Sequence, residues 1–218
     1  MDVFEALYTT RAMRRVRPDP IPAEVQASIL DAAIRAPSGG NSQRWRFVLV
    51  DDPAVREALA ALYRSAFRTL METAYAGPIE AMEKDPDAPA SIELGTMLRS
   101  GRYLADHFAD VPLLLFAFTR HDPTGQSLLP AVWSAMLAAR AHGVGSALTT
   151  VLTLFAAEQT ATILGMPPGE GWSNPCAVTF GYPLGRWAVA ARRPAADVTY
   201  RNAWGRPAGL DIAGPLWP

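Results

Sequence analysis

Residues 36–45 have the sequence Ala36-Pro37-Ser38-Gly39-Gly40-Asn41-Ser42-Gln43-Arg44-Trp45 and separate an apolar helical pattern from a β-branched run. Its two glycines let a backbone approach a ligand closely, and its short polar side chains supply hydrogen-bond donors and acceptors. The alternative is a plain helix-to-strand turn in which the glycines close the helix. We interpret Trp45 as a core residue. This stretch is therefore a candidate binding loop at the junction of two elements.

The segments on either side alternate between helical and strand patterns. Helices are expected near residues 2–9, 22–36, 52–67, 91–108, 130–142 and 156–164, and strands near residues 45–50, 112–119, 146–150 and 177–181. The 112–119 strand is apolar on both faces and is predicted to be central and covered. Residues 77–90 hold three prolines and mixed charge, which predicts a mobile excursion. The pattern indicates an α+β fold in one domain, residues 1–218, with a sheet covered by helices.

The composition excludes several classes of protein. The 218 residues carry a net charge of −1, which favours neither nucleic acid nor an anionic membrane as a partner. The chain shows no signal-peptide pattern and no apolar run long enough to span a bilayer, so a cytoplasmic location is expected. No metal site is expected, because His107, His121 and His142 show no paired ligand spacing. The single cysteine, Cys176, is interpreted as a buried small apolar residue.

Four arginines fall within residues 11–17, just before the turn sequence Pro18-Asp19-Pro20. Arginine grips phosphate with two parallel hydrogen bonds, so the cluster is a candidate phosphate site. A solvated turn is the alternative. A third segment, residues 143–150, comes after an expected helix. It begins with Gly-Val-Gly-Ser and continues into a β-branched run. Its spacing is not that of a dinucleotide-binding G-x-G-x-x-G motif, because position 148 is leucine.

These three segments, in this order and at this separation, resemble the nitroreductase family of flavoproteins. The resemblance consists of R-x-x-R before the Pro-Asp-Pro-Ile turn, A-P-S-G-x-N-x-Q-x-W, and G-x-G-S near residue 145, and it covers nearly the whole chain. Arg192-Arg193-Pro194 falls where the family has a basic phosphate ligand. The chain departs from the family pattern at Thr10, Ala12 and Arg44, where arginine, serine and proline are common.

The resemblance implies a three-layer fold with a central mixed or antiparallel sheet and an intertwined homodimer that binds FMN across the subunit interface. Arg11 and Arg14 would contact the FMN phosphate, ribityl chain or pyrimidine edge, and Ala12 would contribute its backbone. Thr149 and Thr150 would lie along the isoalloxazine near N5. The remaining implied ligands are Arg192, closing on the phosphate, and Pro37, Ser38, Gly39 and Asn41 from the opposite subunit.

The implied function is an FMN-dependent oxidoreductase in which NADH or NADPH reduces the flavin at N5 and a small-molecule acceptor, such as a nitroaromatic or quinone, takes the electrons. The protein itself then needs no acid–base pair, and no catalytic side chain is assigned. Phe67, Tyr75 and Tyr103 are candidates for the acceptor pocket. A second hypothesis is specialised flavin chemistry, either reductive dehalogenation or oxygen-dependent oxidation or fragmentation. A third is a flavin-binding or storage protein without turnover, which the departures at Thr10 and Ala12 keep open.

Overall fold

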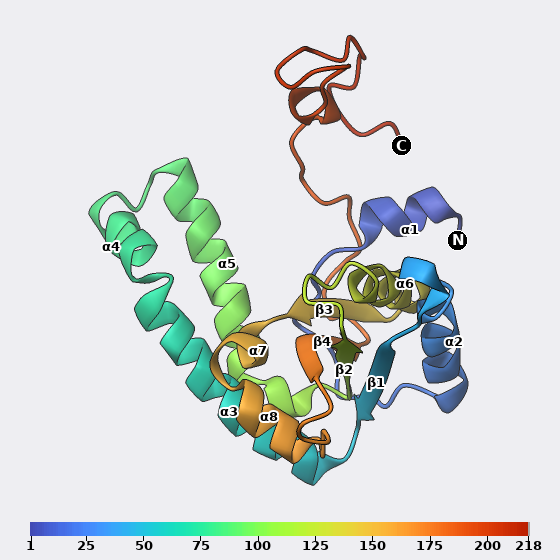
Figure 1. The fold of residues 1–218 in the computed structure, drawn as a ribbon. Helices are drawn as coiled ribbons and strands as arrows, with labels where there is room; N and C mark the ends of the chain where they lie inside the picture. Colours follow the sequence, from blue (N-terminus) through green and yellow to red (C-terminus); the bar gives the residue numbers. More distant parts are fainter. Residues whose placement is uncertain (218) are drawn as a thin grey trace. The chain divides into compact units, whose positions relative to one another are not determined.

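The computed structural model describes residues 1–217, and the chain divides into two compact units. The larger unit is Arg11–Arg186, and the smaller unit combines Met1–Thr10 with the chain from Trp187 onward. The larger unit holds a four-stranded antiparallel sheet in the order β1-β2-β4-β3, with β1 Trp45–Val50, β2 Leu113–Arg120, β3 Gly145–Thr149 and β4 Trp172–Gly181 (Figure 1). None of the helices in residues 1–217 combines the length and apolar character needed to cross a bilayer.

Strand β2 is the buried centre of this sheet. It pairs antiparallel with β1 on one side and β4 on the other, and its side chains are buried on both faces from Leu113 to Thr119. The predicted central strand is thereby confirmed. The register between β2 and β4 shifts between Ala117 and Thr119, opposite Pro175 of β4. A proline lacks the N–H that a regular ladder needs, so it is tolerated at this irregular point.

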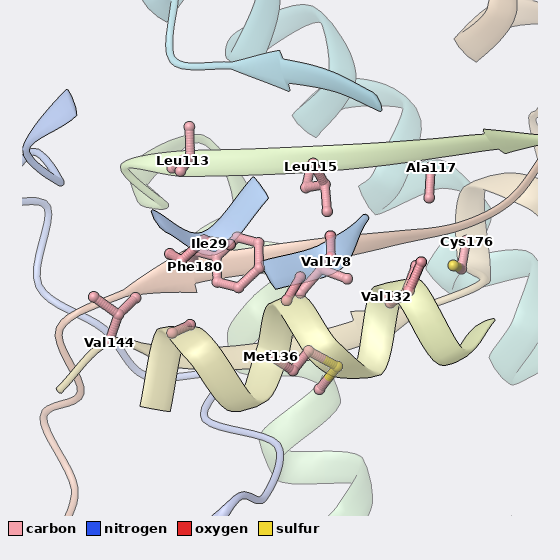
Figure 2. Packing of buried hydrophobic residues seen from close by; sticks show 14 of the residues in the cluster. Ile29, Leu113, Leu115, Ala117, Val132, Met136, Val144, Cys176, Val178 and Phe180 are labelled. Atoms are coloured by element: carbon pink, nitrogen blue, oxygen red, sulfur yellow. The ribbon is translucent and has the colours of Figure 1, made fainter. Parts of the chain in front are cut away.

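Two helices, α2 (Ala23–Ala33) and α6 (Leu128–Ala141), cover one face of the sheet (Figure 1). Figure 2 shows the apolar side chains of this layer lying between α6 and strands β2 and β4. Asp122 fixes the start of α6, because its carboxylate accepts hydrogen bonds from the backbone N–H groups of residues 126, 127 and 128. Cys176 lies in this layer and is fully buried, as the sequence predicted.

The opposite face is covered by α3 (Pro53–Thr73), α7 (Val151–Phe155), α8 (Ala157–Ile163) and the short 3₁₀ helix η2 (Phe108–Asp110). Helix α3 begins where the sequence predicted, because the Asp52 carboxylate accepts from the N–H groups of Ala54 and Val55 at 2.9 Å. The two covered faces and the sheet between them confirm the predicted three-layer α+β architecture.

Residues 77–90, predicted to be a mobile excursion, instead belong largely to helix α4 (Ala76–Lys84), which a short turn joins to α5 (Pro89–Asp106). The prediction was wrong because it treated every proline as a helix breaker. Pro78 lies in the first turn of α4 and Pro89 begins α5, where a missing N–H costs no helical hydrogen bond. Helix α4 buries none of its residues.

The smaller unit contains α1 (Val3–Thr9) and the 3₁₀ helix η3 (Ala195–Val198). Asp2 caps the N-terminus of α1, since its carboxylate accepts a hydrogen bond from the Glu5 N–H at 2.8 Å. The chain after residue 187 is otherwise irregular, with a single bridge between Tyr200 and Pro207 among its described residues. This agrees with the absence of periodicity in its sequence.

Candidate functional site

The arginine loop, residues 11–17, runs along the ends of β3 and β4. The Met13 N–H donates to the Ser146 carbonyl at 2.9 Å, and the Arg17 N–H donates to the Tyr182 carbonyl at 2.8 Å. Ala12 forms a parallel bridge with Ser146. These backbone hydrogen bonds do not involve the arginine side chains, and they fix the loop at the outer edge of the sheet.

A pair of glycines makes this close approach possible. Gly145 of β3 and Gly181 of β4 are directly opposite each other in the antiparallel register. A Cβ atom at Gly145 would lie 2.8 Å from the Met13 Cβ, and one at Gly181 would lie 2.7 Å from the Val16 Cβ. Both distances are shorter than van der Waals contact, so only glycine lets the loop lie against these strands. The sequence motif identified Gly145 but not Gly181.

The loop and helix α5 together line a cavity of about 450 Å³. Arg11, Arg14 and Arg15 face it, and among residues 1–217 none of the three forms an ion pair with a carboxylate. The Arg14 guanidinium donates to the Ser100 hydroxyl at 3.3 Å, and the Arg11 guanidinium donates to the Arg186 carbonyl at 2.8 Å. Three guanidinium groups without acidic partners form a donor set suited to a phosphate or another electron-rich edge.

Thr149, at the end of β3, belongs to the same region. Its hydroxyl oxygen lies 3.0 Å from the Tyr63 hydroxyl of α3 and accepts a hydrogen bond from the Val151 N–H at 3.3 Å. Burial raises the pKa of Tyr63 above its ordinary value, while the bond to Thr149 and the charge of Arg14 lower it. Arg14 bonds to Ser100 of α5, and α5 packs in the same apolar layer as α3, which carries Tyr63. Arg14 and Thr149, 135 positions apart in sequence, are thus brought to the same side of the sheet. Thr150 follows as the exposed N-cap of α7.

Tyr63 was not among the predicted site residues. It falls at a core position in the apolar periodicity of α3, so its pattern does not distinguish it from a packing residue. The available signal was a hydroxyl group at a position expected to be buried, since buried polar groups need a partner.

The second candidate loop, residues 38–43, lies beside β1 and the start of α6. Gly39–Asn41 form the 3₁₀ helix η1, and the Gly39 N–H donates to the Ser127 hydroxyl at 3.3 Å. The Ser38 hydroxyl accepts from the Gln43 N–H at 3.1 Å. Asn41 and Gln43 have φ angles of 51° and 47°, in the left-handed region. Asparagine tolerates this region, whereas a glutamine seldom adopts it, so the strain lies at Gln43. Such strain clusters at functional sites, which strengthens the interpretation of this stretch as a binding loop.

The structure therefore separates the predicted ligands into groups. Arg11, Ala12, Arg14, Thr149 and Thr150 gather near β3, whereas Pro37, Ser38, Gly39 and Asn41 gather near β1. These are the two outermost strands, about 14 Å apart at ordinary strand spacing. Arg192 lies in the smaller unit, where its guanidinium donates to the Ala191 carbonyl at 2.8 Å. Within one copy of the larger unit, the group of predicted ligands near β3 and the group near β1 therefore stay apart.

Within residues 1–217, no three His, Cys, Asp or Glu side chains cluster closely enough to hold a metal ion. Burial raises the pKa of the Cys176 thiol to about 11, so its nucleophilic thiolate form is disfavoured.

The sequence profile of the nitroreductase family matches residues 7–182 of this chain. The chain belongs to the nitroreductase family. Over 208 residues this nitroreductase-family protein is 33% identical to the 5,6-dimethylbenzimidazole synthase of Rhodospirillum rubrum, a match that covers 88% of the chain and 92% of the relative. The synthase of the same name from Rhodobacter capsulatus is 31% identical over 178 residues, 75% of the chain and 76% of the relative.

Solved structures of flavoproteins share the fold of this nitroreductase-family protein. An iodotyrosine deiodinase bound to FMN and 3-iodo-L-tyrosine superposes with a TM-score of 0.69 at 20% identity, covering 88% of this chain and 95% of that one. A BluB-like flavoprotein from Clostridium difficile 630 gives a TM-score of 0.68 at 18% identity, covering 92% and 99%. At such identities the similarity establishes the nitroreductase fold.

Proposed function

We propose that the protein is an FMN-dependent oxidoreductase that takes hydride from NADH or NADPH and passes electrons to a small electron-poor acceptor such as a nitroaromatic or a quinone. The observation that carries the proposal is the cavity lined by Arg11, Arg14 and Arg15 without acidic partners, together with the buried hydroxyl of Thr149 on the same side of the sheet. Membership of the nitroreductase family supports it.

The residues present fit FMN. The guanidinium groups match its phosphate and its electron-rich pyrimidine edge, Ala12 offers backbone groups, and Thr149 and Thr150 offer hydroxyls. When bound, FMN supplies the hydride-accepting centre and the protein supplies affinity, orientation and electrostatic tuning. A cation such as Arg14 at the pyrimidine edge would stabilise the negative charge that develops there on reduction. Arg192 remains a predicted phosphate ligand.

A homodimer is part of the proposal, because the two groups of predicted ligands lie at opposite edges of one sheet. A two-fold axis would place Pro37, Ser38, Gly39 and Asn41 of each subunit at the arginine loop of the other, and would create two identical sites. We propose that residues 1–218 act as one functional domain in each subunit.

A second candidate function is oxygen-dependent fragmentation of the flavin. It is favoured by the 31% and 33% identity to two 5,6-dimethylbenzimidazole synthases, which extends over most of both chains. In that case, the same arginine loop and Thr149 would bind the flavin as the substrate. Both functions need the FMN site, and they differ in what becomes of the flavin.

One experiment separates these functions. The purified protein is expected to retain FMN, identified by chromatography after heat release, or to take it up on reconstitution. Under anaerobic conditions, NADH or NADPH should bleach the flavin absorbance and a nitroaromatic or quinone should restore it. FMN consumed with formation of a benzimidazole, once reduced protein meets oxygen, would instead support fragmentation. A flavin that no nicotinamide bleaches indicates storage, and absence of FMN binding after reconstitution refutes the flavin site.

A further inference from the structure

Tyr63 is a buried side chain whose ring and hydroxyl group have separate partners. Its ring stacks on Phe108 with a centroid distance of 4.2 Å, and only 3% of its surface is exposed. Its hydroxyl lies 3.0 Å from the Thr149 hydroxyl oxygen, in a hydrogen bond that is itself buried. The stack with Phe108 fills space in the core, so packing alone does not account for a phenol at this position.

The direction of this hydrogen bond follows from the groups around it. The Thr149 hydroxyl oxygen already accepts from the Val151 N–H, which leaves one lone pair and the hydroxyl hydrogen. A phenol is far more acidic than an aliphatic alcohol and is the better hydrogen-bond donor of the two. Tyr63 therefore donates and Thr149 accepts. Both lone pairs of Thr149 are then occupied, and its hydrogen is directed to a third group.

No other acceptor for the Thr149 hydroxyl hydrogen is found among the residues that the structure describes. Thr149 ends β3 and is 9% exposed, on the side of the sheet where Arg14 bonds to Ser100 of α5. The geometry thus leaves the Thr149 hydroxyl as a fixed donor without a protein acceptor, beside the proposed cofactor site.

We propose that Tyr63 is a positioning residue that holds the Thr149 hydroxyl as a hydrogen-bond donor to the reactive edge of the bound flavin. This inference rests on the proposed function, which places Thr149 near the flavin N5. An oxidised flavin accepts a hydrogen bond at N5, whereas a fully reduced flavin carries hydrogen there. Because Tyr63 occupies the remaining lone pair of Thr149, the Thr149 hydroxyl can only donate, and a donor at N5 favours oxidised FMN. Tyr63 therefore lowers the reduction potential of the bound cofactor.

The test compares the parent with Tyr63→Phe, Thr149→Val and the double variant, each as purified apoprotein titrated with oxidised FMN and, anaerobically, with reduced FMN. Tyr63→Phe keeps the ring stack on Phe108 and removes only the hydroxyl. We expect it to lower the preference for oxidised over reduced FMN by about twofold to tenfold, the range for losing one hydrogen bond. The midpoint potential of the bound flavin should rise correspondingly. Thr149→Val should shift both quantities in the same direction, and the double variant no further than Thr149→Val alone.

The matched control is Thr160→Val, because the Thr160 hydroxyl is buried on α8 without a hydrogen-bond partner among the described residues. Its loss should leave the ratio of the two FMN affinities unchanged. If Tyr63→Phe changes stability but not this ratio, or if its effect adds to that of Thr149→Val, Tyr63 is a packing residue and the inference is wrong. If the parent binds no FMN, the proposed function itself fails, which is a distinct result.

Discussion

At the scale of single residues, Arg14 is the side chain on which the proposed phosphate or pyrimidine contact depends most. It faces the cavity, lacks a carboxylate partner among residues 1–217 and influences Tyr63 electrostatically. Arg14→Ala removes charge-assisted hydrogen bonds of about 1.5–3 kcal/mol, so FMN affinity should fall about tenfold to a hundredfold. Fluorescence titration of the apoprotein with FMN measures this directly.

The matched control lies in the same loop. Arg17 is engaged with the Asp19 carboxylate at 3.2 Å and is half-exposed, so Arg17→Ala should change FMN affinity little. Equal affinities for the parent and Arg14→Ala would contradict the placement of the arginine loop at the cofactor.

At the scale of elements, the contact between the arginine loop and the sheet depends on Gly145. Gly145→Ala would place a methyl group 2.8 Å from the Met13 Cβ, and the backbone of neither segment can yield without losing the Met13–Ser146 hydrogen bond. Overpacking of this kind costs about 1–3 kcal/mol. We expect a lower free energy of unfolding in urea and weaker FMN binding, because the loop is displaced from β3.

The control for this prediction is Gly77→Ala in α4. A Cβ atom at Gly77 meets nothing within 4 Å, and alanine favours helix. This variant should be as stable as the parent or slightly more so, with unchanged FMN affinity. A Gly145→Ala protein that unfolds at the same urea concentration as the parent would show that the loop is not pressed against the strand.

The sequence predicted best those elements whose ends are determined by their own residues and immediate neighbours. Strand β1 begins and ends at the predicted residues, Trp45 and Val50, because its aromatic and β-branched stretch is bounded by the charged residues Arg44 and Asp51. Strand β4 begins at Trp172, five residues before the prediction, since Pro175 argued against a strand and is accommodated by the register shift. Helix α7 has only five residues and was not predicted, because it is too short to show a period.

The residues of the candidate site likewise fall into those that the sequence could predict and those that it could not. The arginine loop and the residues 38–43 loop are contiguous segments, so their chemistry is visible in the sequence. Tyr63 and Gly181 act through neighbours distant in the chain, Thr149 and Val16, and these pairings are created by the sheet register and the packing of α3. No local pattern encodes them.

At the scale of the whole molecule, the separation of the predicted ligands predicts a dimer with shared sites. Light scattering should give twice the chain mass, and an obligate interface of this kind is expected to bury more than about 2,000 Å². Co-expression of two defective chains tests the sharing. Arg14→Ala removes the arginine contact, and Gly39→Val adds bulk where a Cβ meets nothing within 4 Å in its own chain. Each heterodimer should contain one intact site and recover FMN.

The matched control co-expresses Arg14→Ala with Arg11→Ala, whose defects lie in the same half of the site. Every site in that heterodimer carries a defect, so FMN retention should not recover. Recovery in neither mixture, or a monomer that holds FMN, would show that the site is built within one chain and that Pro37, Ser38, Gly39 and Asn41 are wrongly assigned.

Helix α4 has a consequence for the divergence of such proteins. Because it buries none of its residues, mutations in it change folding stability little, and selection does not remove them on that ground. Nearly every residue of β2, by contrast, is fixed by the packing on both of its faces. Substitutions in α4 and in the turn to α5 can therefore accumulate quickly during evolution, while the sequence of the sheet stays nearly constant.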